Sequence, residues 1–234
     1  MFEIGAAFTT AFRLIVGFDA ALVQIVALSL EVSLTAVAIG TAAGLPLGAA
    51  VALARFPGRR LTVITLNALM GLPPVVVGLI LYLMLSRAGP LGSLGLLFTP
   101  GAMIIAQAVL IAPIVAALAR QIVEDAWNDY EEQLRSLGAS PRRAVWTLLW
   151  DTRFSLLTVV LSGFGRASAE VGAVMIVGGN INGVTRMMTT AIALETSKGD
   201  LPLALGLGVI LMILVLLANA AAYAIKEAAA RHAG

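Results

Sequence analysis

Residues 120–153 have the sequence RQIVEDAWNDYEEQLRSLGASPRRAVWTLLWDTR, which is rich in charge, whereas the chain on both sides is almost uncharged. Charged side chains are costly in hydrocarbon, so a charged segment between membrane-length apolar runs is expected at a water-facing surface. The order of its residues predicts two short helices joined by a tight turn. We therefore expect this polar segment to be a docking element for a partner.

The turn within the polar segment is predicted at residues 138–140. Gly138 tolerates the left-handed backbone conformation with which many helices end. Ser140 carries a hydroxyl that can cap the next helix, and Pro141 suits the first helical position. The segment also holds all three tryptophans of the chain, whose amphipathic rings suit either a headgroup-level anchor or a partner's cleft: Trp127, Trp146 and Trp150.

Composition excludes an ordinary soluble domain. The 234 residues are 60% hydrophobic and 12% charged, whereas soluble domains approach about a quarter charged. The chain has no cysteine and a single histidine, His232, which argues against disulfides and metal sites. Its lysines, Lys198 and Lys226, lie outside any phosphate-binding loop, and Asp151 lacks a second carboxylate for hydrolysis. We therefore expect an integral membrane protein that is not an enzyme, holds no metal or cofactor and binds no nucleic acid.

Apolar runs long enough for a bilayer core, which needs about 20 residues, recur along the chain. We place the spans at about residues 24–54, 61–86, 99–120, 154–180 and 201–226. The expected fold class is an all-α integral membrane protein with about five transmembrane helices, forming a single transmembrane domain over residues 1–234.

The distribution of basic residues predicts the orientation of the chain. Ten fall on the same side as the polar segment: Arg55, Arg59, Arg60, Arg120, Arg135, Arg142, Arg143, Arg153, Lys226 and Arg231. Four fall on the other side: Arg13, Arg87, Arg186 and Lys198. The positive-inside rule therefore places the polar segment and the C-terminus in the cytoplasm and the N-terminus outside. Residues 1–17 carry apolar side chains at helical spacing and predict a helix lying in the outer interface.

Small residues and prolines mark the predicted spans. Gly40, Gly44 and Gly48 recur every four residues, which predicts a smooth stripe for close helix packing. The prolines remove backbone donors within spans and predict kinks or opened turns at three places: Pro46, the Pro73–Pro74 pair and Pro113.

Arg166 and Glu170 are the only charges in the fourth predicted span. Their spacing of four is expected to put both on one helix face, where they can pair. One interpretation is an internal ion pair that fixes helix register. The other is a site at which Arg166 lowers the barrier for a passing anion and Glu170 keeps the binding weak. Glu31 is an alternative partner for Arg166.

Residues 177–190, VGGNINGVTRMMTT, form a glycine-rich loop at the outer end of that span. Its glycines, including Gly179, permit irregular backbone, while Asn180 and Arg186 supply donors for an oxyanion. A selective gate and a simple connecting loop are both consistent with this composition. The charged residues that follow are expected to form a solvated face: Glu195, Lys198 and Asp200.

Part of the polar segment resembles a cytoplasmic loop of the permease subunits of ATP-binding-cassette importers. In that loop a glutamate is followed six residues later by a glycine, and a short helix plugs into the ATPase. Residues 132–138, EQLRSLG, followed by Ala-Ser-Pro at 139–141, match this pattern, although Gln133 and Leu134 replace the family's two alanines. The resemblance implies a coupling segment over residues 124–151, with ATPase contacts from Glu132, Ser136, Leu137, Gly138, Ala139 and Ser140.

The resemblance covers nearly the whole chain. GFGRA at 163–167, EVGA at 170–173 and the Gly-Asn and Thr-Arg pairs at 179–186 are similar to the molybdate and tungstate branch of these permeases. MMTTAIALETSKGD at 187–200 looks like the tungstate-type subunit. The implied fold is the transmembrane domain of a type I importer, with a cytoplasmic pair of coupling helices.

The resemblance also implies partners and a role. The permease would work as a homodimer in a prokaryotic inner membrane, with two ATPase subunits that bind ATP and Mg, and an extracytoplasmic oxyanion-binding protein. The substrate implied is a tetrahedral oxyanion, tungstate first, with molybdate or sulfate as alternatives. Apart from the resemblance, a secondary anion transporter is a competing hypothesis for the function of the chain. The residues expected along the translocation pathway are Arg166, Glu170, Gly179, Asn180 and Arg186.

Overall fold

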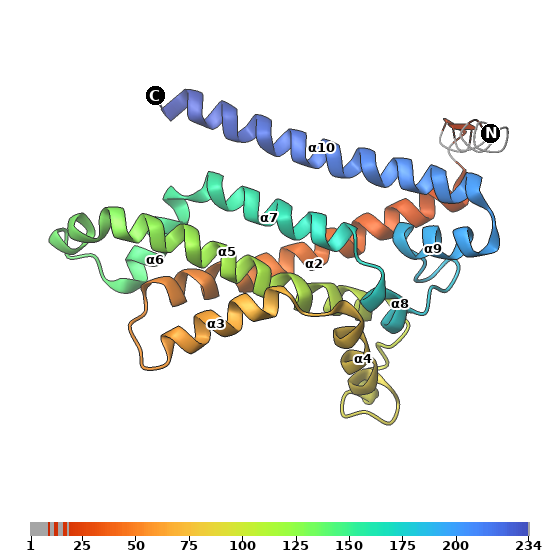
Figure 1. The fold of residues 1–234 in the computed structure, drawn as a ribbon, viewed down its shortest axis with the longest axis horizontal. Helices are drawn as coiled ribbons and strands as arrows, with labels where there is room; N and C mark the ends of the chain where they lie inside the picture. The colour runs from red at the N-terminus through yellow and green to blue at the C-terminus, as the bar shows by residue number, and fades with distance from the viewer. Residues whose placement is uncertain (1–8, 10–11, 14–15, 18, 234) are drawn as a thin grey trace. The chain divides into compact units, whose positions relative to one another are not determined.

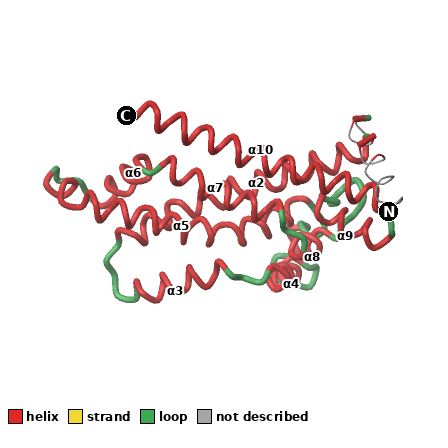
Figure 2. The backbone as a smooth tube through the Cα atoms, turned by 45° about the horizontal axis from the view of Figure 1, so that its top comes forward, coloured by secondary structure: helices red, strands yellow, loops and turns green. Residues whose placement is uncertain are grey.

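The computed structural model describes residues 9, 12–13, 16–17 and 19–233, and all regular structure within them is helical (Figures 1 and 2). The elements are α2 (Ala20–Leu53), α3 (Arg59–Met70), α4 (Pro74–Leu85), the 3-10 turn η1 (Gly92–Leu94), α5 (Pro100–Ser136), α6 (Pro141–Asp151), α7 (Arg153–Ser168), α8 (Gly172–Gly178), α9 (Met188–Lys198) and α10 (Leu201–Ala233). The all-α prediction is confirmed for these residues. The interfacial helix predicted over 1–17 lies largely outside them.

Three of the described helices are long and apolar enough to cross a membrane by themselves: α2, α5 and α10. Two pairs of successive helices, each bent at a short break, bring the number of candidate spans to five if each pair is counted as one span. They are α3 with α4, bent by 97°, and residues 143–151 of α6 with α7, bent by 78°. The predicted span 154–180 is not one helix, because α7 ends at Ser168 and α8 begins at Gly172.

The three proline sites behave differently. Pro46 and Pro113 lie inside α2 and α5, each of which continues past its proline. The Pro73–Pro74 pair separates α3 from α4. There Gly71 ends α3, Pro73 is extended with ψ 118°, and Pro74 takes the first helical position of α4. A proline disfavours helical backbone in the residue before it, so two in succession interrupt the helix.

The chain forms two compact units. The first contains residues 1–36, 73–107 and 167–218; the second contains residues 37–72, 108–166 and 219–234. In the first unit α4 packs on α8, where a Cβ on Gly78 would lie 2.8 Å from the Cα of Ala173. A separate apolar core joins three helices of this unit through Leu22 of α2, Met188 and Ala191 of α9, and Leu207 of α10.

In the second unit the glycine stripe of α2 packs closely on another helix, as predicted, and the structure shows that this helix is α5. A Cβ at Gly44 would meet the Ala112 carbonyl oxygen at 2.8 Å, and one at Gly48 would meet the Ala116 carbonyl oxygen at 2.3 Å. Because these contacts are with backbone, only glycine permits this spacing of the two helices. Further along, Val51 of α2 packs with Leu66 of α3 on α5.

Replacing Gly48 with alanine is therefore expected to destabilise the protein by about 1–3 kcal/mol, the usual cost of overpacking. The thermal unfolding midpoint of the purified protein in detergent should fall by about 2–4 °C for each kcal/mol. The matched control is Gly208→Ala in α10, where nothing lies within 4 Å of the added Cβ. Equal midpoints for the two variants would contradict the close α2–α5 contact.

Candidate coupling segment and translocation loop

The turn between α5 and α6 has the predicted position and chemistry. Gly138 has φ +66°. The Gly138 N–H donates to the Arg135 carbonyl at 3.0 Å, and the Ala139 N–H donates to the Leu134 carbonyl at 3.0 Å. This pair of bonds is a Schellman motif, which satisfies the last carbonyls of α5 and reverses the chain within two residues. The predicted break at 138–140 is confirmed.

The start of α6 also has the predicted cap. Ser140 is extended, and its hydroxyl accepts a hydrogen bond from the Arg143 N–H at 3.4 Å. Pro141 takes the first helical position. Ser136 uses its hydroxyl locally as well, because it donates to the Gln133 carbonyl at 2.8 Å. The two serines thus define the turn, while Glu132 and Leu137 are exposed.

The first helix of the polar segment differs from the prediction of two short helices. It is the end of α5, which runs for 37 residues from Pro100 without interruption. No glycine or proline lies between Pro113 and the turn, and Arg120 forms an ion pair with Glu124 one turn further on. The turn at Gly138 is therefore attached directly to a helix that also contains a candidate membrane span.

Helix α6 presents one face to the protein and another to the surroundings. Leu148 is 1% exposed and packs in a cluster with Ala52 of α2 and Val123 of α5. On the opposite face Trp146 and Trp150 are 61% and 71% exposed. Leu137 in the adjoining turn is 82% exposed. Exposed apolar side chains gathered on a well-anchored element are typical of a surface that binds a partner.

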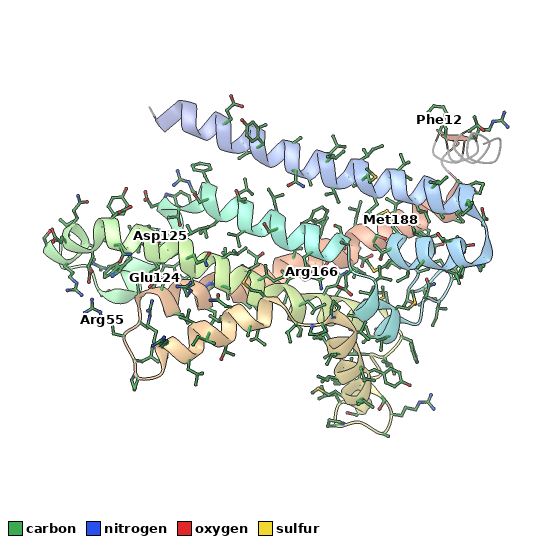
Figure 3. The ribbon with its side chains drawn as sticks, in the orientation of Figure 1. Phe12, Arg55, Glu124, Asp125, Arg166 and Met188 are labelled. Atoms are coloured by element: carbon green, nitrogen blue, oxygen red, sulfur yellow. The ribbon has the colours of Figure 1, made fainter. Side chains whose placement is uncertain are left out.

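Ion pairs tie the base of the coupling segment to the neighbouring helices. Glu124 of α5 accepts from Arg59 of α3 at 2.7 Å and also pairs with Arg120. Arg59 in addition donates to the Val51 and Ala52 carbonyls, at 3.0 and 3.1 Å, and so caps the end of α2. Further along α5, Glu131 pairs with Arg55 and Arg135; Figure 3 labels Glu124 and Arg55.

The break between α7 and α8 lies at the predicted pathway residues. Glu170 is 2% exposed, and its carboxylate accepts from the Ala173 N–H at 3.0 Å at the start of α8. Its backbone carbonyl accepts from the Thr189 hydroxyl at 2.8 Å. Arg166 stands near the end of α7 (Figure 3). Because the helix ends at Ser168, the expectation that both charges share one helical face is wrong, and their pairing stays a prediction.

The glycine-rich loop folds around the N-terminal end of α9. Gly179 has φ +72°, and a Cβ there would lie 2.9 Å from the ring of Phe98. Asn180, with φ +50°, donates through its side-chain amide to the Thr190 carbonyl at 3.3 Å. The Met188 N–H donates to the Ser29 hydroxyl of α2 at 2.7 Å. The irregular backbone is thus held by hydrogen bonds to α9.

Arg186 contributes to an ion cluster rather than to an open cationic site. Its guanidinium lies 3.9 Å from the carboxylate of Glu195, which also accepts from Lys198 at 2.9 Å. Glu195 is 6% exposed, so the expectation of a solvated face is wrong for this residue. The cluster compensates the charge of Arg186 and connects the loop to the far end of α9.

The chain matches a protein family over most of its length. The family described as "Binding-protein-dependent transport system inner membrane component" matches residues 44–232. The chain belongs to this family. It is therefore a permease subunit of an ATP-binding-cassette transporter, a translocation component rather than a catalytic one, and the ATPase is a separate subunit in this family.

Several curated relatives resemble the permease. It is 41% identical over 224 residues to the tungstate uptake system permease protein TupB of Peptoclostridium acidaminophilum, covering 96% of this chain and 98% of that protein. It is 41% identical to a probable anion ABC transporter permease protein of Haloferax volcanii, covering 85% and 88% of the two chains. It is 40% identical to TupB of Campylobacter jejuni, covering 74% and 72%.

Some residues that position the candidate sites of the permease were missed from sequence. Gln107 of α5 is 1% exposed and donates to the Ala167 carbonyl at 3.1 Å, next to the break before α8. Phe98 has φ +62° and donates its N–H to the Val177 carbonyl at 2.9 Å. The sequence did contain a signal for Gln107, because it is a polar residue within an apolar run. It contained no local signal for Phe98.

Replacing Glu195 with glutamine in the permease is expected to lower stability by about 1–3 kcal/mol, because the partly buried Arg186 loses its carboxylate partner. The thermal unfolding midpoint should fall clearly below that of Glu31→Gln, a control at an exposed carboxylate of α2. Indistinguishable midpoints would show that the cluster does not stabilise the glycine-rich loop.

Proposed function

We propose that the chain is the permease of an importer for tetrahedral oxyanions, with tungstate as the preferred substrate. The substrate would cross by alternating access, driven by a separate ATPase that binds ATP and Mg. The single observation that carries this proposal is similarity over 96% of the chain to a tungstate uptake permease. Sulfate and molybdenum permeases are also similar, at 31% and 29% identity, so those anions are the second candidates.

We propose further that residues 124–151 form the surface that binds the ATPase. Support comes from the rigid turn at Gly138, the exposed Leu137, and the tryptophans on the outer face of α6. The anchored inner face of α6 would transmit a displacement of this surface to α2 and α5, because all three share one apolar cluster. A rigid element seated in a partner's cleft is a common way to couple two conformations.

The distribution of charge supports a cytoplasmic coupling segment and C-terminus, with the N-terminus outside. Of the 15 basic residues of the chain, the first unit holds Arg13, Arg87, Arg186 and Lys198, and the second unit holds the other eleven, which are the ten counted on the predicted cytoplasmic side and Arg166 of the proposed pathway. The coupling segment lies in the second unit. A concentration of basic residues around one set of helix ends is typical of the cytoplasmic side.

The pathway is proposed to run past the break between α7 and α8 and the glycine-rich loop, with Arg166, Glu170, Gly179, Asn180 and Arg186 as its polar residues. The buried cap by Glu170 and the ion cluster at Arg186 favour a gate that moves as a unit. The working assembly would be a homodimer with two ATPase subunits and an extracytoplasmic binding protein.

Replacing Gly138 with valine is expected to uncouple ATP hydrolysis from uptake. A β-branched residue in left-handed backbone costs roughly 1–2 kcal/mol, which corresponds to about a tenfold change in an equilibrium. Uptake per ATP hydrolysed should fall by about that factor in vesicles containing permease, ATPase and binding protein.

The matched control for this variant is Gly199→Val. Gly199 also has positive φ, +84°, and open space around its Cβ position, but it ends α9 outside the coupling segment. Similar coupling ratios for the two variants would refute the role proposed for the turn.

The substrate is tested by uptake of tungstate, molybdate and sulfate at equal concentration in the same vesicles. Tungstate uptake should exceed that of the other two anions, and it should require both the binding protein and ATP. Uptake by the permease without the ATPase would instead indicate a secondary transporter and would overturn the proposed mechanism.

A further inference from the structure

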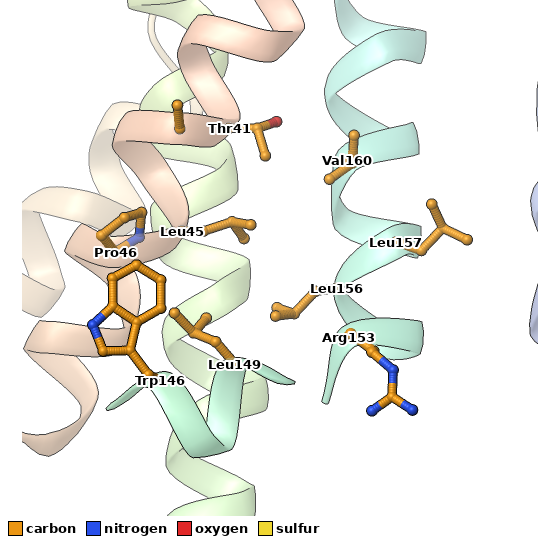
Figure 4. Close-up of a pocket in the computed structure, with 10 residues that line it drawn as sticks. Thr41, Leu45, Pro46, Trp146, Leu149, Arg153, Leu156, Leu157 and Val160 are labelled. Carbon is orange, nitrogen blue, oxygen red and sulfur yellow. The ribbon is translucent and has the colours of Figure 1, made fainter. Parts of the chain in front are cut away.

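An open-sided apolar pocket of about 440 Å³ lies within the second unit, between α2, α6 and α7 (Figure 4). Its walls are formed by Leu45 and Pro46 of α2, Leu149 of α6, and Leu157 and Val160 of α7. The volume falls in the range of roughly 300–1,000 Å³ that is usual for small-molecule sites. The pocket is separate from the glycine-rich loop, and it shares Trp146 with the outer face of α6.

The polar groups of the pocket stand at its ends. Trp146 and Arg153 lie at one end, and the hydroxyl of Thr41 lies at the other (Figure 4). From Arg153 to Val160 the pocket follows two turns of α7, or about 10 Å of helix. The arrangement is an apolar channel that ends beside Arg153, whose guanidinium points away from Leu149 and Leu156 (Figure 4).

Arg153 is held in place by its neighbours. Its guanidinium lies 4.8 Å from the centre of the Trp150 ring and 4.5 Å from that of Phe154. One terminal nitrogen donates to the Trp150 carbonyl at 2.7 Å, which anchors the group beside the bend between α6 and α7. The side chain is exposed, so its other N–H donors are accessible to an anion.

We propose that this pocket binds an anionic phospholipid from the leaflet that borders the coupling segment. One acyl chain lies along the apolar walls, and the phosphate contacts the guanidinium of Arg153. The charge of Arg153 selects an anionic headgroup over a neutral one. The neighbouring Trp146 fits this position, since tryptophan favours the level of the headgroups.

The bound lipid has a mechanical consequence. It contacts the helix that carries the coupling surface and the two helices on either side of the pocket, so it steadies the 78° bend between α6 and α7. The class of lipid in the membrane therefore affects how firmly the coupling segment is held.

Trp146 provides a direct test. In a Trp127→Phe, Trp150→Phe permease it is the one tryptophan left of the three. This protein is placed in phosphatidylcholine vesicles containing a minor fraction of phosphatidylglycerol brominated on its acyl chains, or the same fraction of brominated phosphatidylcholine. Brominated phosphatidylglycerol should occupy the site with about a fivefold preference, the ratio expected for one basic side chain near the surface.

Two variants assign the effect to the pocket. Arg153→Gln should abolish the preference between the two lipids, and Ala42→Phe, which fills the pocket from α2, should reduce quenching by both. The control Arg143→Gln removes an exposed basic residue that does not line the pocket and should keep the preference. Equal quenching by both lipids in the parent protein would overturn the proposal.

A second copy of the chain is the competing occupant. The chain has no cysteine, so a Leu157→Cys variant provides a single thiol in the pocket. Efficient disulfide linkage of two copies through this thiol, without lipid-dependent quenching, would assign the pocket to a subunit interface and overturn the lipid proposal. These assays do not measure transport. A negative result would therefore disprove lipid binding at the pocket without bearing on the proposed anion import.

Discussion

The close contact between the backbones of α2 and α5 is the constraint on which the second unit depends. Gly44 and Gly48 leave room for the carbonyls of Ala112 and Ala116, so the backbones of the two helices come close together. In a membrane, where lipid is as apolar as the helix surface, such contact is a main source of helix association. It fixes the position of α5 relative to α2. In the proposed orientation this contact therefore also positions the coupling segment, which lies at the cytoplasmic end of α5.

The first unit uses polar contacts for the same purpose. Helix α9 is short, yet it makes three polar contacts with the residues before it. The Thr189 hydroxyl donates to the Glu170 carbonyl, and the Thr190 carbonyl accepts from the Asn180 amide. Glu195 pairs with Arg186. Since unpaired polar groups are costly in an apolar environment, these bonds favour one conformation of the loop. A rearrangement of the proposed pathway would therefore involve α9 as well as the residues that face the substrate.

Sequence reasoning succeeded where the determinant is local. Gly138, Ser140 and Pro141 specify their turn through conformational preferences that act within a few residues, and the structure has that turn. The glycine stripe was predictable because its period matches one helical face. The tandem prolines likewise break a helix without help from distant residues.

Other features depend on contacts between distant parts of the chain. Pro46 and Pro113 do not end their helices, because packing and the remaining helical bonds outweigh one missing donor. The break after Ser168 contains no proline, and Gln107 and Thr189 contact it from elsewhere in the sequence. The burial of Glu195 was missed because a charged stretch near a glycine is usually a solvated turn. The tryptophans of α6 could be named from the sequence as candidates for contact with a partner or with the headgroups. The pocket that Trp146 lines could not, because it depends on how α2, α6 and α7 pack together.

The length of α5 has a consequence for the scale of movement. At 37 residues it is about 55 Å long, whereas the hydrocarbon core of a bilayer is about 30 Å thick. Roughly 25 Å of unbroken rod therefore extends past the hydrocarbon if the helix crosses it. A rotation of about 10° at the bilayer boundary would swing the far tip of such a rod by roughly 4 Å, enough to shift a seated side chain to a neighbouring position.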